Sequence, residues 1–365
     1  MNDEMNCLKM QVRSIKEDGS LVLDLSPTQL LNTKITYGDL LNVRIDKDID
    51  LRIPFVSQLA SAGFLGPCLC DFEMQHKELT LKLHSGNFAK SIGGEIGSKV
   101  EIRLLKKDNG LFNKVAELHY EEAQKNEETN LVYSNFRMIN FRQFKKNVIY
   151  RSCSPINYKF SPGRVACADS LCKDKQIKTV INLADTYEDV EKYIKSFGRE
   201  RCPYYSELFY SGGVYCAKMS QSFFNDDSVS VIAVILRIIL ECQQPYLIHC
   251  NEGKDRTGLF FALMECLMHC KNSDIIDDYM QSYVNFYQLK KNCEEYLFLE
   301  KILPVRFLYV LSHMECINTI PLEWESSKAD VQQDDYYDAA YSFLIKKVHI
   351  KHDEIAKLQS ILGTN

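Results

Sequence analysis

At 365 residues, the chain is long enough for two domains of ordinary size, and its 45% hydrophobic and 25% charged residues are typical of a globular protein. A formal net charge of -5 shows no basic bias, so nucleic acid is not an expected partner. The N-terminus lacks the basic start and apolar run of a signal peptide, and the apolar stretches 229–240 and 259–268 are too short to span a bilayer. We therefore expect a cytoplasmic protein without a transmembrane segment.

The cysteines and histidines do not have the spacing of a metal site. The 14 cysteines are scattered without a C-x-x-C pair, and the 8 histidines show no ligand pattern. In a protein that is not exported, such cysteines are expected to be free thiols. We expect neither a metal nor another cofactor.

Residues 1–120 form a β-rich region. Short apolar runs of strand length are separated by frequent glycine and proline, which predicts a small barrel or sandwich; the runs are 21–25, 40–45, 79–83 and 100–104. Residues 51–56 and 86–97 resemble the C-terminal β-barrel domain of S-adenosylmethionine hydroxide adenosyltransferases, and we use this resemblance for the fold only. No group of residues in this region indicates a chemical function.

The character of the chain changes after residue 120. Residues 121–130 are polar and highly charged, which predicts a linker. From 131 to 320, strand-length apolar runs alternate with helical patterns, so an α/β domain with a largely parallel sheet is expected; the runs are 148–150, 179–183, 214–219 and 246–248. Residues 321–365 predict amphipathic helices packed on the body of the protein.

One loop carries the residues for a defined chemistry. The apolar run 246–248 leads directly into His-Cys-Asn-Glu-Gly-Lys-Asp-Arg-Thr-Gly at 249–258, and a helical pattern follows. A phosphate dianion is bound well by inward-pointing backbone N–H groups, a helix N-terminus and a fork of donors. Gly253 permits the backbone angles of such a cradle, and Arg256 supplies the fork.

The nucleophile of this loop is predicted to be Cys250. The N–H cradle that binds phosphate also favours a thiolate, which is the reactive form of cysteine. Thr257 can hydrogen-bond the sulfur and help it to leave in a second step. The C-x5-R spacing alone is a weak signal, since Cys7 and Arg13 share it without a glycine or a strand–helix setting. We therefore assign function to the loop at 249–258 and none to the earlier copy.

Residues 249–258 resemble the signature loop of protein tyrosine and dual-specificity phosphatases. The Gly-Lys-Asp-Arg-Thr-Gly version at 253–258 is similar to a bacterial branch whose members dephosphorylate phosphotyrosine and phosphoinositides. Supporting segments cover roughly residues 131–300 of the chain and are 150–152, 178–183 and 274–280. The resemblance implies that the loop binds the substrate phosphate through residues that surround the nucleophile, namely His249, Asn251, Glu252, Gly253, Lys254 and Gly258.

One position departs from this branch. Its central strand usually ends in Asp-Leu-Arg, whereas this chain reads Asn182-Leu183-Ala184, so a positive side chain is missing. The departure bears on substrate preference more than on the chemistry. Lys254 is predicted to direct a second cation toward the pocket, with a solvated loop lysine as the alternative.

The general acid has two candidate positions. The resemblance implies Asp255, whose alternative role is to brace the loop by pairing with Arg or Lys. Asp226 or Asp227 could act instead, because other tyrosine phosphatases keep a mobile acid upstream of the loop; the alternative for this pair is a helix N-cap before Ser228. For His249 we expect a role in ordering the loop.

The sequence thus predicts a phosphatase that hydrolyses phosphate monoesters through a phosphocysteine, without a metal. Phosphotyrosine-type substrates are placed first, and phosphoinositides or inositol phosphates are the alternative. A catalytically silent phosphate-binding module is a competing hypothesis from another class. Sulfur transfer, as in rhodanese-like domains, is a second, but the Gly253, Lys254, Asp255 and Thr257 set favours phosphate.

Overall fold

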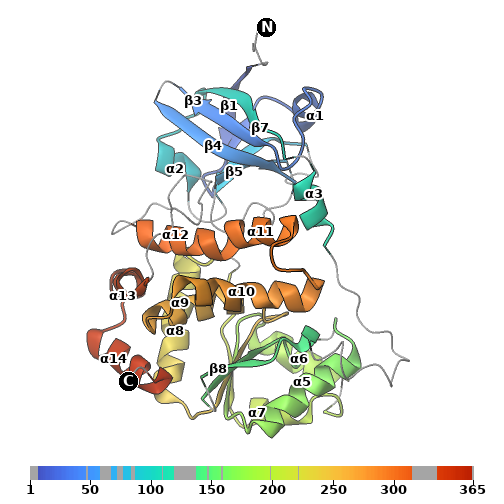
Figure 1. Ribbon diagram of the computed structural model, residues 1–365, viewed down its shortest axis with the longest axis vertical. Coiled ribbons are helices and arrows are strands. Elements are labelled where there is room, and N and C mark those ends of the chain that lie inside the picture. The colour runs from blue at the N-terminus through green and yellow to red at the C-terminus, as the bar shows by residue number, and fades with distance from the viewer. Residues whose placement is uncertain are drawn as a thin grey trace. The chain divides into compact units, whose positions relative to one another are not determined.

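The computed structural model describes residues 7–46, 48–57, 67–71, 77–83, 87–108, 110–118, 137–145, 148–157, 159–197, 199–220, 222–314 and 335–363. Its contacts define two compact units, one from Met1–Leu118 with Asn292–Gln332 and one from His119–Lys291 with Gln333–Asn365 (Figure 1). The predicted linker at 121–130 lies outside the described residues. The domain boundaries expected from the sequence remain predictions.

The strands of the first unit form a closed barrel in the order β1-β2-β6-β5-β4-β3-β7. Antiparallel pairing of β1 with β7 closes it, with Leu8 opposite Ile102, and β4 pairs in parallel with β5. The expectation of a barrel or sandwich is therefore confirmed, as a barrel. The strands are β1 Leu8–Ile15, β2 Leu21–Leu23, β3 Leu40–Ile45, β4 Ile49–Val56, β5 Pro67–Cys70, β6 Thr80–Leu83 and β7 Lys99–Lys106.

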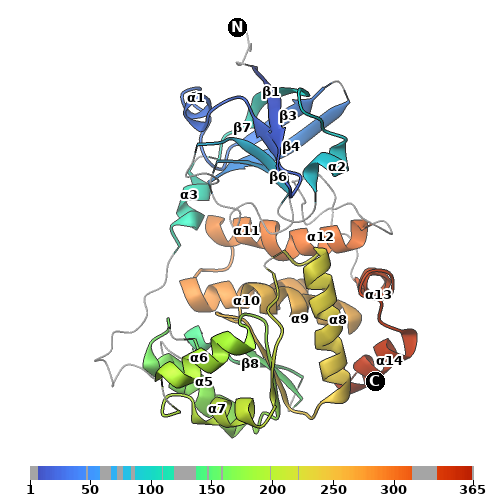
Figure 2. The same ribbon diagram turned by 180° about the vertical axis from the view of Figure 1, so that it is seen from behind.

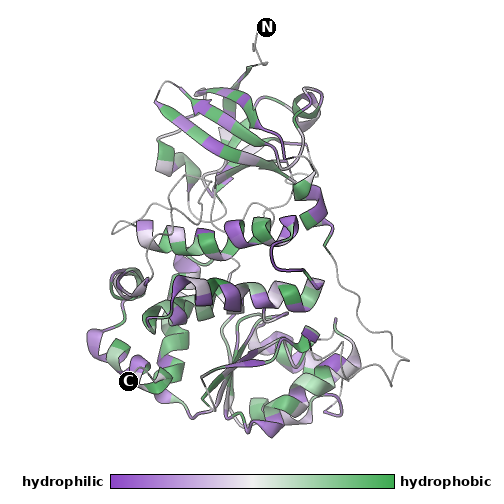
Figure 3. Ribbon diagram, in the orientation of Figure 1, coloured by the Kyte–Doolittle hydropathy of each residue, from purple (hydrophilic) through white to green (hydrophobic). Residues whose placement is uncertain are grey.

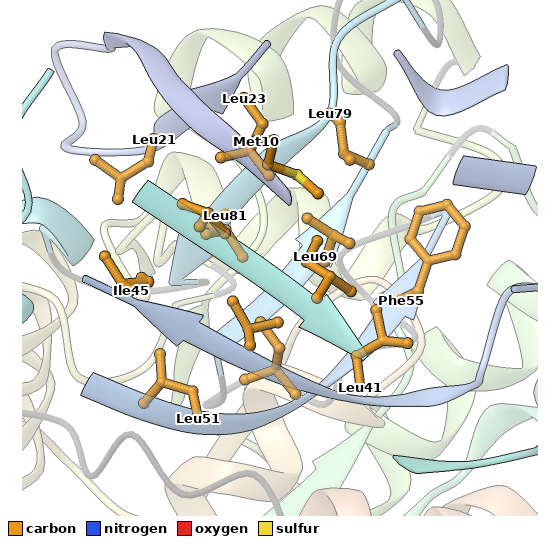
Figure 4. Close-up of a cluster of buried hydrophobic side chains, with 14 of the residues drawn as sticks. Met10, Leu21, Leu23, Leu41, Ile45, Leu51, Phe55, Leu69, Leu79 and Leu81 are labelled. Carbon is orange, nitrogen blue, oxygen red and sulfur yellow. The ribbon is translucent and has the colours of Figure 1, made fainter. Parts of the chain in front are cut away.

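Alternating side chains on these strands fill the barrel. Along β3 and β4 hydrophobic and hydrophilic residues alternate (Figure 3), as expected when one face of a strand is buried. The inward side chains form one cluster (Figure 4), in which Leu21, Leu41, Phe55 and Leu81 are fully buried. Such a filled interior is a core for stability.

The helices of the first unit are short. Ser26 starts α1 with a capping box, since its Oγ accepts from Gln29 N at 3.2 Å while Gln29 Oε1 accepts from Ser26 N at 2.9 Å. In the same unit, α11 packs near α3, where Lys114 Nζ lies 3.4 Å from Glu294 Oε2. The helices are α1 Pro27–Leu31, α2 Phe88–Ile92, α3 Leu111–Ala116, α11 Glu294–Glu300, the π-helix η3 Lys301–Val305, and α12 Arg306–His313.

The second unit is built on a five-stranded sheet in the order β11-β10-β12-β9-β8. The first four of these strands are parallel, and β8 joins the edge in the antiparallel direction. The predicted α/β domain with a largely parallel sheet is therefore confirmed. The strands are β8 Arg142–Lys145, β9 Ile149–Ser152, β10 Thr179–Asn182, β11 Val214–Cys216 and β12 Tyr246–His249.

Helices cover both sides of this sheet, with α5, α6 and α7 on one side and α8 and α9 on the other (Figure 2). The predicted helical tail is also confirmed: α13 packs against α9, and α14 packs against α8. None of the described helices is long and apolar enough to cross a membrane. The helices are α5 Pro162–Asp174, α6 Tyr187–Phe197, α7 Pro203–Tyr210, α8 Asp226–Glu241, α9 Asp255–Leu267, α10 Asn272–Tyr287, α13 Tyr337–Lys346 and α14 His352–Leu362.

Candidate active site

The sheet delivers the loop at 249–258 to the carboxyl edge of its central strand. β12 lies between β10 and β9, with His249 opposite Asn182 on one side and Ser152 on the other. Cys250 follows β12 directly and is 3% exposed, and α9 begins only five residues later, at Asp255. The predicted succession of strand, loop and helix is therefore confirmed. This edge of a parallel sheet is where ligands bind in open α/β folds.

Two glycines allow the loop to pack against its neighbours. Gly253 has a φ of +66°, and a Cβ there would lie 2.1 Å from the carbonyl oxygen of Ser152. A Cβ on Gly258 would lie 2.7 Å from Cε2 of Tyr279. Both positions therefore require glycine, the first for its backbone angle and for space, the second for space alone.

Arg256 is anchored through one end of its guanidinium group. Its Nη1 donates to the carbonyl oxygens of Leu183 at 2.9 Å and Met219 at 3.3 Å. Leu183 directly follows β10, and its N–H donates to the carbonyl of His249 at 2.7 Å. Among the described residues, the hydrogen bonds of Arg256 use Nη1, so Nε and Nη2 are available to a ligand.

Lys254 is enclosed rather than solvated. It is 7% exposed, and its Nζ lies 3.3 Å from Glu252 Oε2 and 3.5 Å from Asp255 Oδ2. Nζ also donates to the hydroxyl of Tyr287 at 3.1 Å. Burial alone would lower the pKa of Lys254, but these carboxylates raise it well above its usual value. The ammonium group is therefore charged and already balanced by two carboxylates.

The two candidate acids have different surroundings. Asp255 lies in the first turn of α9, and its Oδ1 accepts a hydrogen bond of 2.6 Å from the hydroxyl of Tyr283. Asp226 and Asp227 are exposed in the first turn of α8. The N-cap of α8 is Asn225, whose Oδ1 accepts from Ser228 N at 2.8 Å. The suggestion that Asp226 or Asp227 caps this helix is therefore wrong, because Asn225 occupies that place.

His249 is a neutral, buried residue directly before Cys250. Its Nδ1 lies 3.0 Å from the carbonyl oxygen of Cys250, and its Nε2 lies 3.5 Å from the hydroxyl of Tyr205. Burial lowers the pKa of His249 to about 4. At neutral pH, Nδ1 therefore donates to the loop backbone while Nε2 is an acceptor, an arrangement that orders the loop.

The remaining loop residues complete the cradle. Thr257 is fully buried, and its hydroxyl has no hydrogen-bond partner among the described residues. Asn251 is exposed, and its carbonyl oxygen accepts from the N–H of Ser154 at 2.7 Å. In contrast, Cys7 directly precedes the barrel strand β1, and Arg13 lies within that strand. Nη2 of Arg13 pairs there with Oε1 of Glu78 at 2.6 Å. That second copy of the spacing has no cradle.

A buried polar network supports the loop from behind. Arg151 is 1% exposed, donates from Nη2 to the carbonyl of Gly253 at 2.9 Å, and pairs through Nη1 with Asp278 Oδ2 at 2.7 Å. Asn140 Nδ2 donates to the same carbonyl at 2.9 Å and to Ser282 Oγ at 3.1 Å. Burial lowers the pKa of Arg151 to about 10, so it stays charged at neutral pH.

Sequence reasoning did not assign roles to these supporting residues. Residues 150–152 support the resemblance to the phosphatase branch, but nothing in them shows that Arg151 reaches Gly253, 102 positions away. The aromatic spacing on α10 was a usable signal, since Tyr279, Tyr283 and Tyr287 recur every four residues and therefore share one face of the helix.

At the end of β10, the residues that depart from the related branch form a local hydrogen-bond network. The side chain of Asn182 accepts from the N–H groups of Ala184 at 2.8 Å and Asp185 at 3.2 Å, and its Nδ2 donates to Asp185 Oδ2 at 3.1 Å. Burial raises the pKa of Asp185, and the hydrogen bond from Asn182 and the charge of Arg256 only partly offset this effect. Where the related branch has an arginine, this chain thus has alanine followed by a buried carboxyl group.

Comparison with models of protein families matches residues 134–364 to the tyrosine phosphatase family. The chain belongs to this family. As a member, it is a phosphatase, and the resemblance found in the loop is confirmed. A search of curated proteins finds no match. Among the described residues of this phosphatase, no group of three His, Cys, Asp or Glu side chains is placed to hold a metal ion.

Solved structures with similarity to the phosphatase cover parts of it. The core catalytic domain of the PP-IP phosphatase SIW14 from S. cerevisiae is 23% identical over 44% of this chain and 83% of its own, with a TM-score of 0.28. TpbA from P. aeruginosa in complex with pTyr is 17% identical over 45% of this chain and 79% of its own, with a TM-score of 0.28. An uncharacterized conserved protein from Thermotoga maritima is 11% identical over 27% of this chain and 36% of its own, with a TM-score of 0.25.

Proposed function

We propose that this phosphatase hydrolyses phosphate monoesters through a covalent phosphocysteine on Cys250. In the first step the Cys250 sulfur bonds to phosphorus while the P–O bond to the leaving group breaks and the leaving oxygen takes a proton. In the second step a water attacks phosphorus, the S–P bond breaks, and inorganic phosphate is released. The observation that carries the proposal is the position of Cys250, between the end of a central strand and the N-terminus of α9.

The surroundings of Cys250 suit the binding of an anion. The first turn of α9 directs backbone N–H groups and the positive end of a helix dipole toward the loop. The carbonyl of Gly253 in the same loop accepts from the buried, charged Arg151. These features suit a bound phosphate anion.

Arg256 and Thr257 are assigned the two supporting roles. The anchored Nη1 of Arg256 fixes the plane of the guanidinium, so Nε and Nη2 can form a two-donor fork on a phosphate. The buried hydroxyl of Thr257, unpartnered among the described residues, is assigned to the Cys250 sulfur, which it would stabilise as the S–P bond breaks. His249, Asn251, Glu252, Gly253, Lys254 and Gly258 shape and brace the phosphate cradle.

We assign the proton transfers to Asp255, with Asp226 as the alternative acid. Asp255 belongs to the loop and its side chain is 29% exposed, so a substrate can reach it. Asp226 is exposed on the first turn of α8, whose preceding segment contacts Arg256 through the carbonyl of Met219. The same carboxyl group can give a proton to the leaving oxygen and later accept one from the attacking water.

For the substrate we place phosphotyrosine-type aryl phosphates first. A single phosphate needs only the backbone cradle and Arg256. Lys254 is balanced by Glu252 and Asp255, and Asp185 adds a further carboxyl group near Arg256, so Lys254 offers no unbalanced positive charge to a second phosphate. Phosphoinositides or inositol phosphates remain the alternative substrate class. We also infer a reducing compartment such as the cytoplasm, since every cysteine among the described residues is a free thiol.

The test is turnover of a generic aryl phosphate in the presence of a chelator, by the wild type and by Cys250→Ser. We expect chelator-resistant turnover in the wild type, none in the variant, and retained binding of phosphate or vanadate by both. Full activity of Cys250→Ser would contradict the proposal. Wild-type binding without turnover would instead indicate the silent phosphate-binding module.

A further inference from the structure

Three tyrosines of α10 form a stripe against the loop. Tyr279, Tyr283 and Tyr287 are spaced by four residues, and neighbouring ring centroids are 6.0 Å and 5.9 Å apart. Tyr283 is 5% exposed. A buried tyrosine normally directs its hydroxyl to a polar partner, so the partners of this stripe show what it serves.

Those partners are the two charged residues that precede Arg256. The hydroxyl of Tyr283 donates to Asp255 Oδ1 at 2.6 Å, while Tyr287 accepts from Lys254 Nζ at 3.1 Å. Lys254 Nζ also lies 4.7 Å and 5.1 Å from the ring centroids of Tyr283 and Tyr287, within cation–π range. The tyrosines and Lys254 therefore form one connected cluster around Asp255.

Both carboxylate oxygens of Asp255 are held from outside the phosphate cradle. Oδ1 takes the hydrogen bond from Tyr283, and Oδ2 lies 3.5 Å from Lys254 Nζ. Burial, together with the nearby Asp255, raises the pKa of Tyr283 well above its usual value, so its hydroxyl stays protonated and donates. Each carboxylate oxygen can accept two hydrogen bonds. The contacts therefore fix the orientation of Asp255 and still leave room for a proton on it.

We propose that Tyr283 is a positioning residue for Asp255, and that Lys254 is a second residue that fixes the same carboxyl group. The inference rests on the proposed function, in which Asp255 transfers the proton. A side chain in the first turn of α9 that is 29% exposed would otherwise sample several rotamers, and misplacement by about 1 Å can cost on the order of 10²-fold in rate. Neither Tyr283 nor Lys254 then needs to touch the substrate.

A pair of aryl phosphates with a good and a poor leaving group separates this role from a general structural one. Protonation of the leaving oxygen matters most for the poor leaving group. For Tyr283→Phe we expect kcat/KM, which reports the first step, to fall about tenfold with the poor leaving group and less than about twofold with the good one. Lys254→Met should show the same selectivity, which keeps the test decisive if one variant folds poorly.

Tyr204→Phe is the matched control. It also removes one hydrogen-bonding hydroxyl from the phosphatase unit, since Tyr204 donates to the carbonyl of Ile177 at 2.8 Å, but it lies outside the loop contacts. Both kcat/KM values of this control should equal those of the wild type.

A double-mutant cycle between Tyr283 and Asp255 completes the test. In an Asp255→Asn background, Tyr283→Phe should cause no further selective loss, because residues acting through one group are not additive. Equal loss on both substrates, or full additivity with Asp255→Asn, would overturn the positioning role alone. Absence of turnover in the wild type would overturn the proposed function together with it.

Discussion

In the barrel, the side chains that meet at the centre are aliphatic or aromatic, whereas around the loop of the phosphatase unit charged and polar side chains are buried. Arg151, Lys254 and His249 are buried within or directly behind this loop. Taking such groups out of water costs free energy unless each finds a partner. In the described structure each of these three side chains has polar partners, so polar contacts replace simple packing around this loop.

The comparison teaches where each kind of substitution acts. A change in the barrel core removes packing and should lower stability without altering the chemistry of the folded enzyme. A change in the buried network of the phosphatase unit leaves a charge or a donor without its partner, so stability and activity should fall together. The variants below test this division, from the largest expected effect to the smallest.

Removing the sulfur of Cys250 has the largest expected effect. Cys250→Ser should lower kcat by on the order of 10⁴-fold or more, as expected when the nucleophile of an enzyme is lost. Cys68→Ser is the barrel counterpart, since Cys68 is fully buried among apolar neighbours. It should cost about 1–3 kcal/mol of stability through its buried hydroxyl while kcat/KM per folded molecule stays unchanged. Aryl phosphate kinetics measure the activity of both variants, and thermal unfolding measures their stability. A large loss of kcat in Cys68→Ser would contradict the expectation that a barrel substitution affects stability alone.

Breaking the ion pair of the buried Arg151 comes next. Arg151→Met removes the 2.7 Å partner of Asp278, which keeps Arg142 at 2.8 Å, and one of two donors to the Gly253 carbonyl. It should destabilise the enzyme by about 1–3 kcal/mol. The barrel pair Arg13–Glu78 is comparably short but lies at the surface, so Arg13→Met should cost less than about 1 kcal/mol. Urea unfolding of both variants gives the two values, and equal values would show that burial does not decide the cost.

The pH dependence of stability reports on His249. Its pKa is about 4 in the folded state because of burial, against about 6.5 when exposed, so protons favour the unfolded chain. As the pH falls from 6.5 to 4, the contribution of His249 to the free energy of unfolding should decrease by about 3 kcal/mol. His249→Gln should flatten that part of the unfolding profile. A wild-type profile flat from pH 6.5 to 4 would contradict the neutral, buried state.

The smallest expected effect concerns substrate preference. Ala184→Arg restores the positive side chain that the related branch carries, and a charged hydrogen bond to a second phosphate, worth about 1.5–3 kcal/mol, should raise kcat/KM for soluble phosphoinositides about tenfold or more. Activity on a phosphotyrosine peptide should change little. Lys254→Ala should leave the KM for phosphoinositides unchanged, because its ammonium group is already paired with Glu252 and Asp255. A raised KM for phosphoinositides alone in Lys254→Ala would reverse our order of substrates.

The sequence by itself determined the features that are local in the chain. The cradle is contiguous at 249–258, so its strand, its glycine turn and its helix follow from residue types and spacing alone. Alternation of strands and helices likewise sufficed for a largely parallel sheet. These predictions hold because backbone geometry and the burial of one face are set by neighbouring residues.

Only the tertiary structure decided what surrounds that cradle. Barrel closure pairs Leu8 with Ile102, and such distant pairings are not encoded in the periodicity of either strand, so the sequence left the choice between barrel and sandwich open. Lys254 was expected to direct its charge into the pocket, but Tyr283 and Tyr287, about 30 residues away, enclose it together with two carboxylates. The physical reason is the same in both cases: the partner of a side chain depends on how remote segments pack, and packing is a property of the whole fold.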